Sequence, residues 1–317
     1  MTAISVVVPT IGGPRLARVL DSLAGQTLPH QTLVVDDGSG DPAIAELVRE
    51  RDGVELLALE RNSGFSRACN LAAQRVDGDV LVLLNDDCVV DEGFLAGLVE
   101  VLDPAAGVTM ASSIMRDWAE PELIDSAGME LDHTLLVWDY LNGEPLELIE
   151  RGVPDPVGPS AAAAAFDRSA FLDVGGFDEG LFAYWEDVDL VLRMRREGQT
   201  CRLAAGATGT HEHSASFGSG SARKNYLTGY GRGYVLRKWS VMTARRIPAV
   251  LARDAVVCAG QAVMDRNLSG VRGRIRGWRD VRPQFPYPAD LPAGRAPSAL
   301  GTLQRRLARR ARLRSRD

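Results

Sequence analysis

The sequence lacks several features that mark secreted and disulfide-stabilised proteins. Residues 1–8 lead directly into an apolar segment, without the basic stretch and long apolar core of a signal peptide. Cysteine is scarce, and no two cysteines have the spacing typical of a zinc site or a disulfide framework. We therefore expect a protein of a reducing compartment. The four cysteines are Cys69, Cys88, Cys201 and Cys258.

A long uncharged hydrophobic run is also missing. The most apolar stretch, residues 247–264, is interrupted by Arg253 and Asp254, and we expect it to be too short and too charged for a transmembrane span. Hydrophobic residues nevertheless make up 45% of the 317 residues, and charged residues 25%. This composition is typical of a globular protein with one large core or two domains, and it excludes a disordered chain.

Basic residues are scarce in the first two thirds of the chain, and acidic residues are scarce in the last third. Residues 1–217 carry 14 basic and 37 acidic side chains, a net charge of −23, whereas residues 218–317 carry 22 and 5, a net charge of +17. An acidic part suits chemistry assisted by a metal ion. The basic part suits an anionic partner, either a phospholipid surface or a lipid-linked diphosphate. The alternative is a helical cap that packs against the acidic part, and we expect no nucleic-acid partner.

Strand and helix signals alternate through the first 112 residues. Apolar runs without alternation predict buried strands at residues 4–8, 32–35, 54–59, 80–84 and 108–111. Helical spacing of apolar residues predicts helices at 14–26, 42–51, 66–74 and 91–102, the third capped by Ser66. Such strands, separated by helices, indicate an α/β fold with a mainly parallel sheet, which binds ligands beyond the carboxyl ends of its strands.

The pattern changes after residue 112. Glycine and proline at intervals predict a hairpin-rich insert over residues 113–158. Further strands are expected at 161–166 and 199–204, and further helices at 168–174 and 187–197. From about residue 222 the chain is expected to be helical, and its tail from Leu300 has the spacing of a basic amphipathic helix.

An acidic cluster, Asn85-Asp86-Asp87, directly follows the apolar run at residues 80–84. Asn85 and Asp87 share one direction in an extended chain, and Asp86 takes the other. Oxygen ligands of this kind suit Mg²⁺ or Mn²⁺ bound to the phosphates of a substrate. The alternative is a solvated acidic turn.

A second cluster places Glu186, Asp187 and Asp189 beside Tyr184 and Trp185, just before a predicted helix. A partly buried carboxylate next to aromatic rings makes a good general base. The alternative is helix capping, for which one carboxylate would suffice.

Three weaker signals complete the set of candidate residues. His211 lies in a predicted loop, where an imidazole would complete an oxygen-rich metal site, although a surface histidine without a role is the alternative. Asp36 and Asp37 end the second predicted strand, where an aspartate suits the N–H of a pyrimidine base or simply forms a turn. Asn62 and Gly64 precede a helix N-terminus, which suits an anion.

Taken in order, these motifs resemble glycosyltransferase family two, in its rhamnosyltransferase-like branch. The resemblance runs from Ile4 to about Ser216. It rests on seven stretches in family order, which are residues 5–10, 34–39, 62–65 with Asn70, 83–87, 175–179, 185–190 and His211.

The resemblance implies a GT-A, Rossmann-like nucleotide-binding fold. It divides the chain into a transferase domain at 1–217, with a nucleotide-binding half at about 1–112 and an acceptor-binding half at about 113–217, and a basic helical region at 218–317. It also implies a nucleotide-diphosphate sugar as donor, with dTDP-rhamnose or a UDP-sugar as first choice. The acceptor would be a glycan or a polyprenyl-linked glycan in cell-surface polysaccharide and cell wall synthesis. The protein would be cytoplasmic, in peripheral contact with the inner face of the membrane.

The resemblance also assigns roles to individual residues. Asp187 would be the catalytic base of an inverting transfer, assisted by Glu186, while Trp185 and Tyr184 would bind the acceptor. Asp87 and His211 would hold the metal together with Asn85, which stands where the family has aspartate and is therefore a neutral ligand. The donor nucleotide and sugar would contact Pro9, Thr10, Asp36, Asp37, Asn62, Gly64 and Asp86.

Two other functions fit parts of the pattern. One is a non-catalytic nucleotide-sugar-binding protein of the same fold. The other is a sugar-nucleotide pyrophosphorylase, which would need a glycine-rich, basic loop near the N-terminus. Residues 12–15 have only part of the glycine and basic content that this loop requires.

Overall fold

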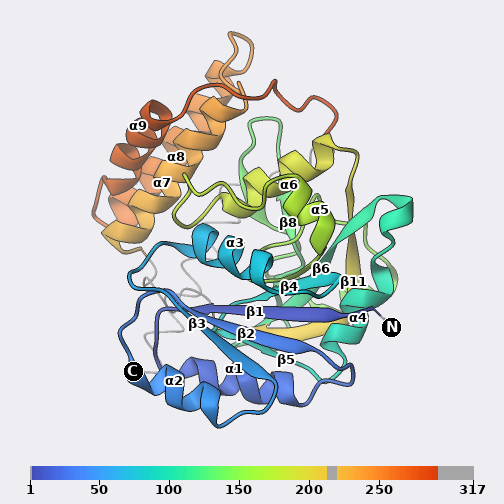
Figure 1. The fold of residues 1–317 in the computed structure, drawn as a ribbon. Helices are drawn as coiled ribbons and strands as arrows, with labels where there is room; N and C mark the ends of the chain where they lie inside the picture. The colour runs from blue at the N-terminus through green and yellow to red at the C-terminus, as the bar shows by residue number, and fades with distance from the viewer. Residues whose placement is uncertain (1, 213–219, 292–317) are drawn as a thin grey trace.

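The computed structural model describes residues 2–212 and 220–291. A nine-stranded sheet forms the centre of this part of the chain (Figure 1). Four strands in the order β3-β2-β1-β4 make a parallel half, as the apolar runs predict. Their bounds are Ile4–Thr10 for β1, Gln31–Asp36 for β2, Val54–Ala58 for β3 and Val80–Leu84 for β4.

The second half of the sheet is mixed rather than mainly parallel. β10 (Ala163–Asp167) enters between β4 and β6 (Val108–Asp117) and runs antiparallel to both. β11 (Thr200–His211) lies parallel to β6, and the short β5 (Cys88–Val90) pairs antiparallel with the end of β11. The chain reverses direction because β10 follows the insert instead of a helical crossover.

The insert between β6 and β10 contains three short strands, as its glycines and prolines predict. β7 (Ile124–Ser126) extends the main sheet beside β6, while β8 (Met129–Leu131) and β9 (Val137–Asp139) form a separate hairpin. A 3₁₀ turn at Leu146–Arg151 follows β9 within the insert, and another at Pro104–Ala106 precedes β6.

Helices cover both faces of the sheet (Figure 1). Alternate side chains of β1 enter two separate cores: Val6 and Val8 pack with α1, α2 and α4, whereas Val7 packs with α3, α5 and α6. Burial of both faces explains why these strands are apolar without alternation. The helices are α1 (Arg15–Ala24), α2 (Pro42–Arg49), α3 (Phe65–Arg75), α4 (Phe94–Val101), α5 (Arg168–Asp173) and α6 (Glu186–Arg196).

Three helices, α7 (Ala222–Lys238), α8 (Ile247–Met264) and α9 (Ser269–Asp280), follow the sheet, as the sequence predicts. α7 is fixed to α6 by the fully buried carboxylate of Asp189, which accepts hydrogen bonds from Lys238 Nζ at 2.8 Å and Trp239 Nε1 at 2.9 Å. α9 packs on α7 so closely that a Cβ at Gly229 would lie 2.1 Å from the carbonyl oxygen of Gly270.

Several predicted details are wrong. Ser66 is not a helix cap, because α3 begins at Phe65 and the Ser66 hydroxyl donates to the carbonyl of Leu181. The helix predicted at 91–102 begins only at Phe94, and residues 88–90 form β5. His211 does not lie in a loop, because β11 continues to it through pairing with β5 and β6.

The expectation for residues 247–264 also needs correction. α8 is the one helix in the described ranges that is long and apolar enough to cross a membrane, judged by length and composition alone. Its 18 residues have a mean hydropathy of 1.4, and 11% of them are buried. The tail helix predicted from Leu300 lies outside the described residues.

Candidate active site

One cavity of about 480 Å³ collects most of the residues singled out in the sequence. It lies beyond the carboxyl ends of β1 and β4, where an α/β sheet binds its ligands. Lys224 and Thr228 of α7 also line it. The sequence-predicted residues in its wall are Pro9, Thr10, Asp37, Asn62, Gly64, Asn85, Asp86, Asp87, Tyr184, Trp185, Glu186, Asp187 and His211.

The turn after β4 presents its acidic side chains to this cavity. The turn is closed by the hydrogen bond from Cys88 N to Asn85 O at 3.1 Å. Asp86 Oδ2 accepts a hydrogen bond of 2.6 Å from Thr10 Oγ1 at the end of β1. Burial raises the pKa of Asp86 to about 6, although the Thr10 hydrogen bond acts in the opposite direction. Thr10 and Asp86 therefore form one buried pair that joins two neighbouring strand ends.

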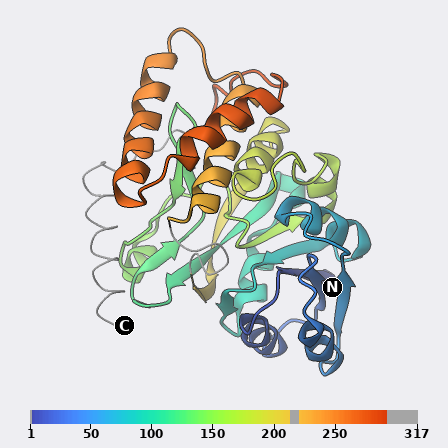
Figure 2. The ribbon, with the colours of Figure 1, turned by 90° about the vertical axis from the view of Figure 1, so that its left-hand side faces the viewer.

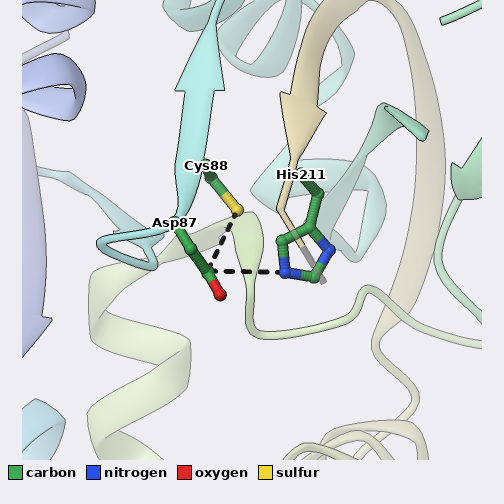
Figure 3. A group of neighbouring side chains, drawn as sticks. All are labelled: Asp87, Cys88 and His211. Atoms are coloured by element: carbon green, nitrogen blue, oxygen red, sulfur yellow. Dashed lines mark hydrogen bonds and ion pairs between the residues drawn. The ribbon is translucent and has the colours of Figure 1, made fainter. Parts of the chain in front are cut away.

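Asp87, Cys88 and His211 form a group with the ligand types of a metal site (Figure 3). Asp87 Oδ1 lies 3.4 Å from His211 Nε2 and 4.0 Å from Cys88 Sγ. One ligand atom from each residue falls within 4.8 Å of the others. Carboxylate and imidazole ligands suit a divalent cation such as Mn²⁺, whereas a thiol favours softer metals. The sequence analysis missed Cys88, although it directly follows Asp87.

The imidazole of His211 is hydrogen-bonded to Asp125, a residue that no sequence motif indicates. Its Nδ1 lies 2.8 Å from Asp125 Oδ2 on β7. Burial alone would lower the pKa of His211, but hydrogen bonds to Asp125 and Asp87 raise it to about 10. The two neighbouring carboxylates thus favour the protonated form of the ring. Asp125 belongs to a short strand of the insert, where nothing in the local pattern marks it.

Asp37, which directly follows β2, lines the cavity and fixes a neighbouring loop. Its Oδ1 accepts hydrogen bonds from the Ser63 backbone at 2.7 Å and the Ser63 hydroxyl at 2.8 Å, and its Oδ2 accepts one from Gly64 N at 2.9 Å. Asp37 thus fixes the loop that leads into α3. Gly64 has a φ of +92°, and a Cβ there would lie 2.5 Å from the carbonyl oxygen of Phe182.

Asp36 is placed differently from its neighbour. Its Oδ1 accepts a hydrogen bond of 2.8 Å from Ser39 N, which stabilises the turn after β2. Asp36 is not one of the described residues that line the cavity.

The segment before α6 brings aromatic side chains into the cavity through an unusual backbone. Tyr184 and Trp185 have consecutive positive φ angles of 68° and 75°, which are uncommon for bulky residues and often mark functional sites. Trp185 is 7% exposed, and the guanidinium of Arg232 lies 5.5 Å from the centre of its ring. The cavity wall at Trp185 is therefore supported directly by α7.

The first two residues of α6 are a carboxyl pair, in which Glu186 is buried and Asp187 is half-buried. Burial raises the pKa of Asp187 to about 6, while backbone hydrogen bonds at Val188 and Ala161 act in the opposite direction. Burial and the charge of Asp187 raise the pKa of Glu186 well above its usual value. Within the described ranges, Glu186 Oε2 has no hydrogen-bond partner. The pair thus places one carboxyl group with a pKa of about 6 beside a second whose pKa is raised further above its usual value.

Comparison with known proteins gives consistent matches. Residues 5–171 match the model of "Glycosyl transferase family 2". The chain is 30% identical over 238 residues to the N-acetylglucosaminyl-diphospho-decaprenol L-rhamnosyltransferase of Mycobacterium tuberculosis, covering 65% of this chain and 74% of that protein. It is 28% identical over 231 residues to the O-antigen biosynthesis protein RfbC of Myxococcus xanthus, covering 67% of this chain but only 17% of RfbC.

A solved structure shares the fold. The crystal structure of GalNAc-T7 with UDP, GalNAc and Mn²⁺ superposes with a TM-score of 0.61 at 18% identity. The match covers 89% of this chain and 55% of that chain. At this identity the likeness concerns the fold alone.

Proposed function

Because the chain belongs to glycosyl transferase family 2, we propose that it transfers a sugar from a nucleotide-diphosphate sugar to an acceptor hydroxyl group. The α/β GT-A fold with a helical C-terminal region, expected from the sequence motifs, is confirmed. The division into domains at residues 1–217 and 218–317 remains a proposal.

One observation carries the proposal: a single cavity contains both a candidate metal group and a pair of adjacent carboxyl groups. Asp87 and His211 lie in its wall with Glu186 and Asp187. A transfer from a diphosphate needs these two functions together, one to stabilise the leaving group and one to activate the acceptor.

Asp87 and His211 are the residues that would hold Mg²⁺ or Mn²⁺, with Asn85 on the same turn. The fit rests on the donor atoms of the described group, a carboxylate oxygen and an imidazole nitrogen 3.4 Å apart. A bound divalent cation would neutralise the negative charge on the departing diphosphate. Pro9, Thr10, Asp37, Asn62, Gly64 and Asp86 would surround the nucleotide and donor sugar, and Asp36 would support them through the turn after β2.

In the proposed reaction, the Asp187 carboxylate removes the proton of the acceptor hydroxyl. The acceptor oxygen attacks the anomeric carbon on the face opposite the diphosphate, and the bond from that carbon to the phosphate oxygen breaks. The nucleoside diphosphate leaves with the bonding electrons, so the anomeric configuration inverts. A base with a pKa of about 6 is largely ionised at neutral pH and still accepts a proton efficiently.

Glu186, Tyr184 and Trp185 would position the acceptor. Glu186 Oε2 is buried and lacks a partner among the described residues, so a substrate hydroxyl would satisfy it. The aromatic rings offer flat surfaces for a sugar.

The resemblance favours dTDP-rhamnose or a UDP-sugar as donor and a glycan or polyprenyl-linked glycan as acceptor. The mycobacterial relative is, by its name, a rhamnosyltransferase that acts on a decaprenyl-diphosphate-linked sugar. This name supports our proposal that the protein acts in cell-surface polysaccharide synthesis, at the inner face of the cell membrane.

The test incubates the purified chain with dTDP-, UDP- and GDP-sugars, with Mn²⁺ or Mg²⁺, and with a short lipid-diphosphate-linked N-acetylglucosamine. A glycosylated lipid product with release of the nucleoside diphosphate is expected. Nucleotide-sugar binding without release of the diphosphate would instead indicate a non-catalytic binding protein. Formation of nucleoside triphosphate from added diphosphate would indicate a pyrophosphorylase.

A further inference from the structure

α8 has exposed apolar side chains on its outward side, while its inward side combines the buried Val250 with polar groups that bond to α7. Its inward side carries polar groups: Asp254 accepts a hydrogen bond of 3.0 Å from the buried Arg232 of α7, and Gln261 donates one of 3.3 Å to Asn225. Val250 and Gln261 are its only buried residues in the described structure. The opposite side carries exposed apolar residues at helical spacing, which are Pro248, Leu251, Ala252, Ala255, Val256, Ala259 and Val263. We call this set the α8 stripe.

Large exposed hydrophobic side chains are concentrated around this stripe. Within the described ranges, seven such residues are exposed, and five of them lie between residues 251 and 275. Leu251 is 55% exposed, Val256 58% and Val263 79%. Leu268 and Ile275, beside and on α9, complete the group. Three of these residues lie on α8 itself, and exposed apolar residues gathered in this way, rather than scattered, mark an interaction site.

The surroundings of the α8 stripe are strongly basic. Residues 220–291 carry fourteen lysines and arginines against four aspartates. Ile275 of α9 stands among the exposed Arg272, Arg276 and Arg279. Arg253 on α8 is 42% exposed, even though it lies 3.4 Å from Asp132. Figure 2 shows α8 at the edge of the molecule, beside α9 and away from α1 and α2.

We propose that the α8 stripe enters the interface of a membrane that contains anionic lipids, with the arginines of α8 and α9 at the level of the headgroups. A helix with an apolar face and flanking arginines is suited to lie in the plane of such an interface. A second copy of the chain fits less well, because a symmetric contact would bring two basic surfaces together.

Docking of α8 on a membrane would bring the cavity close to a lipid-linked substrate. α7 lies between the two features: it carries Lys224 and Thr228 into the cavity wall and bonds to α8 through Asn225 and Arg232. A membrane at α8 is thus one helix layer, about 10 Å, from a helix that lines the cavity. The inference rests on the proposed lipid-linked acceptor for its purpose, but its test needs neither donor nor acceptor.

The test is vesicle flotation of the full chain, with vesicles of phosphatidylcholine alone or mixed with phosphatidylglycerol. The variant Leu251→Glu/Val256→Glu/Val263→Glu places three charges on the stripe at exposed positions. The matched control, Ala43→Glu/Ala58→Glu/Ala105→Glu, adds the same charge at exposed positions on α2, at the end of β3 and in the 3₁₀ turn after α4. Circular dichroism and thermal unfolding check that both variants are folded.

We expect the wild type and the control to bind the phosphatidylglycerol vesicles, and the stripe variant to bind at least about tenfold more weakly. Absence of wild-type binding would overturn the proposal. So would a stripe variant that binds like the wild type, since the unchanged residues 292–317 would then be responsible. A wild-type dimer that the stripe variant converts to monomers, with no change in vesicle binding, would assign the stripe to a second copy instead. Because flotation involves no transfer step, failure here is distinguishable from failure of the proposed reaction.

Discussion

His211 Nδ1 lies 2.8 Å from Asp125 Oδ2, while Nε2 of the same ring faces Asp87 Oδ1 at 3.4 Å. The hydrogen bond to Asp125 fixes the ring so that Nε2 points toward Asp87 and the cavity. A carboxylate in this position also makes the imidazole a better ligand, because it accepts the hydrogen bond of the Nδ1–H and so raises the basicity of Nε2. Asp125 is therefore a positioning residue for the proposed metal.

Asp125→Asn is expected to raise the Mn²⁺ concentration for half-maximal activity by about tenfold or more. The amide keeps the size of the side chain but removes the charge that orients and polarises His211. A Mn²⁺ titration of transfer measures the effect, with saturating Mn²⁺ restoring much of the rate. Asp132→Asn, which changes another buried aspartate of the insert, is the control. An unchanged Mn²⁺ titration for Asp125→Asn would contradict the role given to Asp125.

Asp87 and Cys88 are adjacent but should contribute very differently. Asp87→Asn is expected to abolish Mn²⁺-dependent transfer, because it removes the charged oxygen ligand. Cys88→Ser should keep the rate within about threefold, because Mn²⁺ prefers oxygen and imidazole ligands to sulfur. Parallel metal titrations of the two variants make the comparison. A loss for Cys88→Ser as large as that for Asp87→Asn would show that the sulfur is a required ligand.

The pKa of about 6 for Asp187 predicts the acid limb of the pH profile. A general base works in its ionised form, so kcat should be level above about pH 7 and fall below pH 6. The decline should approach tenfold per pH unit at low pH. Because Glu186 and Asp187 titrate as a pair, the midpoint belongs to the pair. Transfer is measured between pH 4.5 and 8, with thermal unfolding at each pH as control. A rate that stays level down to pH 5 would contradict this assignment.

The sequence predicted the strands, and which site residues meet in one cavity, better than it predicted where helices and loops begin. β4 was predicted with its bounds, because an apolar run without alternation is readily identified. Asp87, Asp187 and His211 lie far apart in the chain but meet in one cavity, as the family order implied. The helix start at Ser66 and the loop at His211 were wrong, because Gly64 supplies the positive φ at the start of α3 and pairing with β5 extends β11.

Asp125 and the exposed side of α8 show what the sequence could not indicate. The role of Asp125 depends on which strand lies beside β6, and this pairing leaves no local pattern. The apolar residues of α8 suggest a buried face by themselves. Only the structure shows that Asp254 and Gln261 bond to α7 and that the apolar residues of the opposite side are exposed.

Gly64→Ala should destabilise the protein by about 3 kcal/mol, because the new Cβ combines a positive φ with a clash at Phe182. Gly53→Ala is the matched control, since its φ is +74° but no described atom lies within 4 Å of the new Cβ. It should cost about 1 kcal/mol. Urea unfolding of both variants gives the two values. Equal losses would show that the contact between the Gly64 loop and Phe182 adds nothing.

The most direct measurement is transfer by Asp187→Asn, with donor affinity determined on the same preparation. Asparagine keeps the shape of the side chain but cannot accept the proton of the acceptor hydroxyl. If Asp187 is the base, the donor dissociation constant should stay within about twofold, while kcat should fall by at least about a hundredfold. A kcat within about tenfold of the wild type, equivalent to roughly 1.4 kcal/mol of barrier, would contradict the assignment.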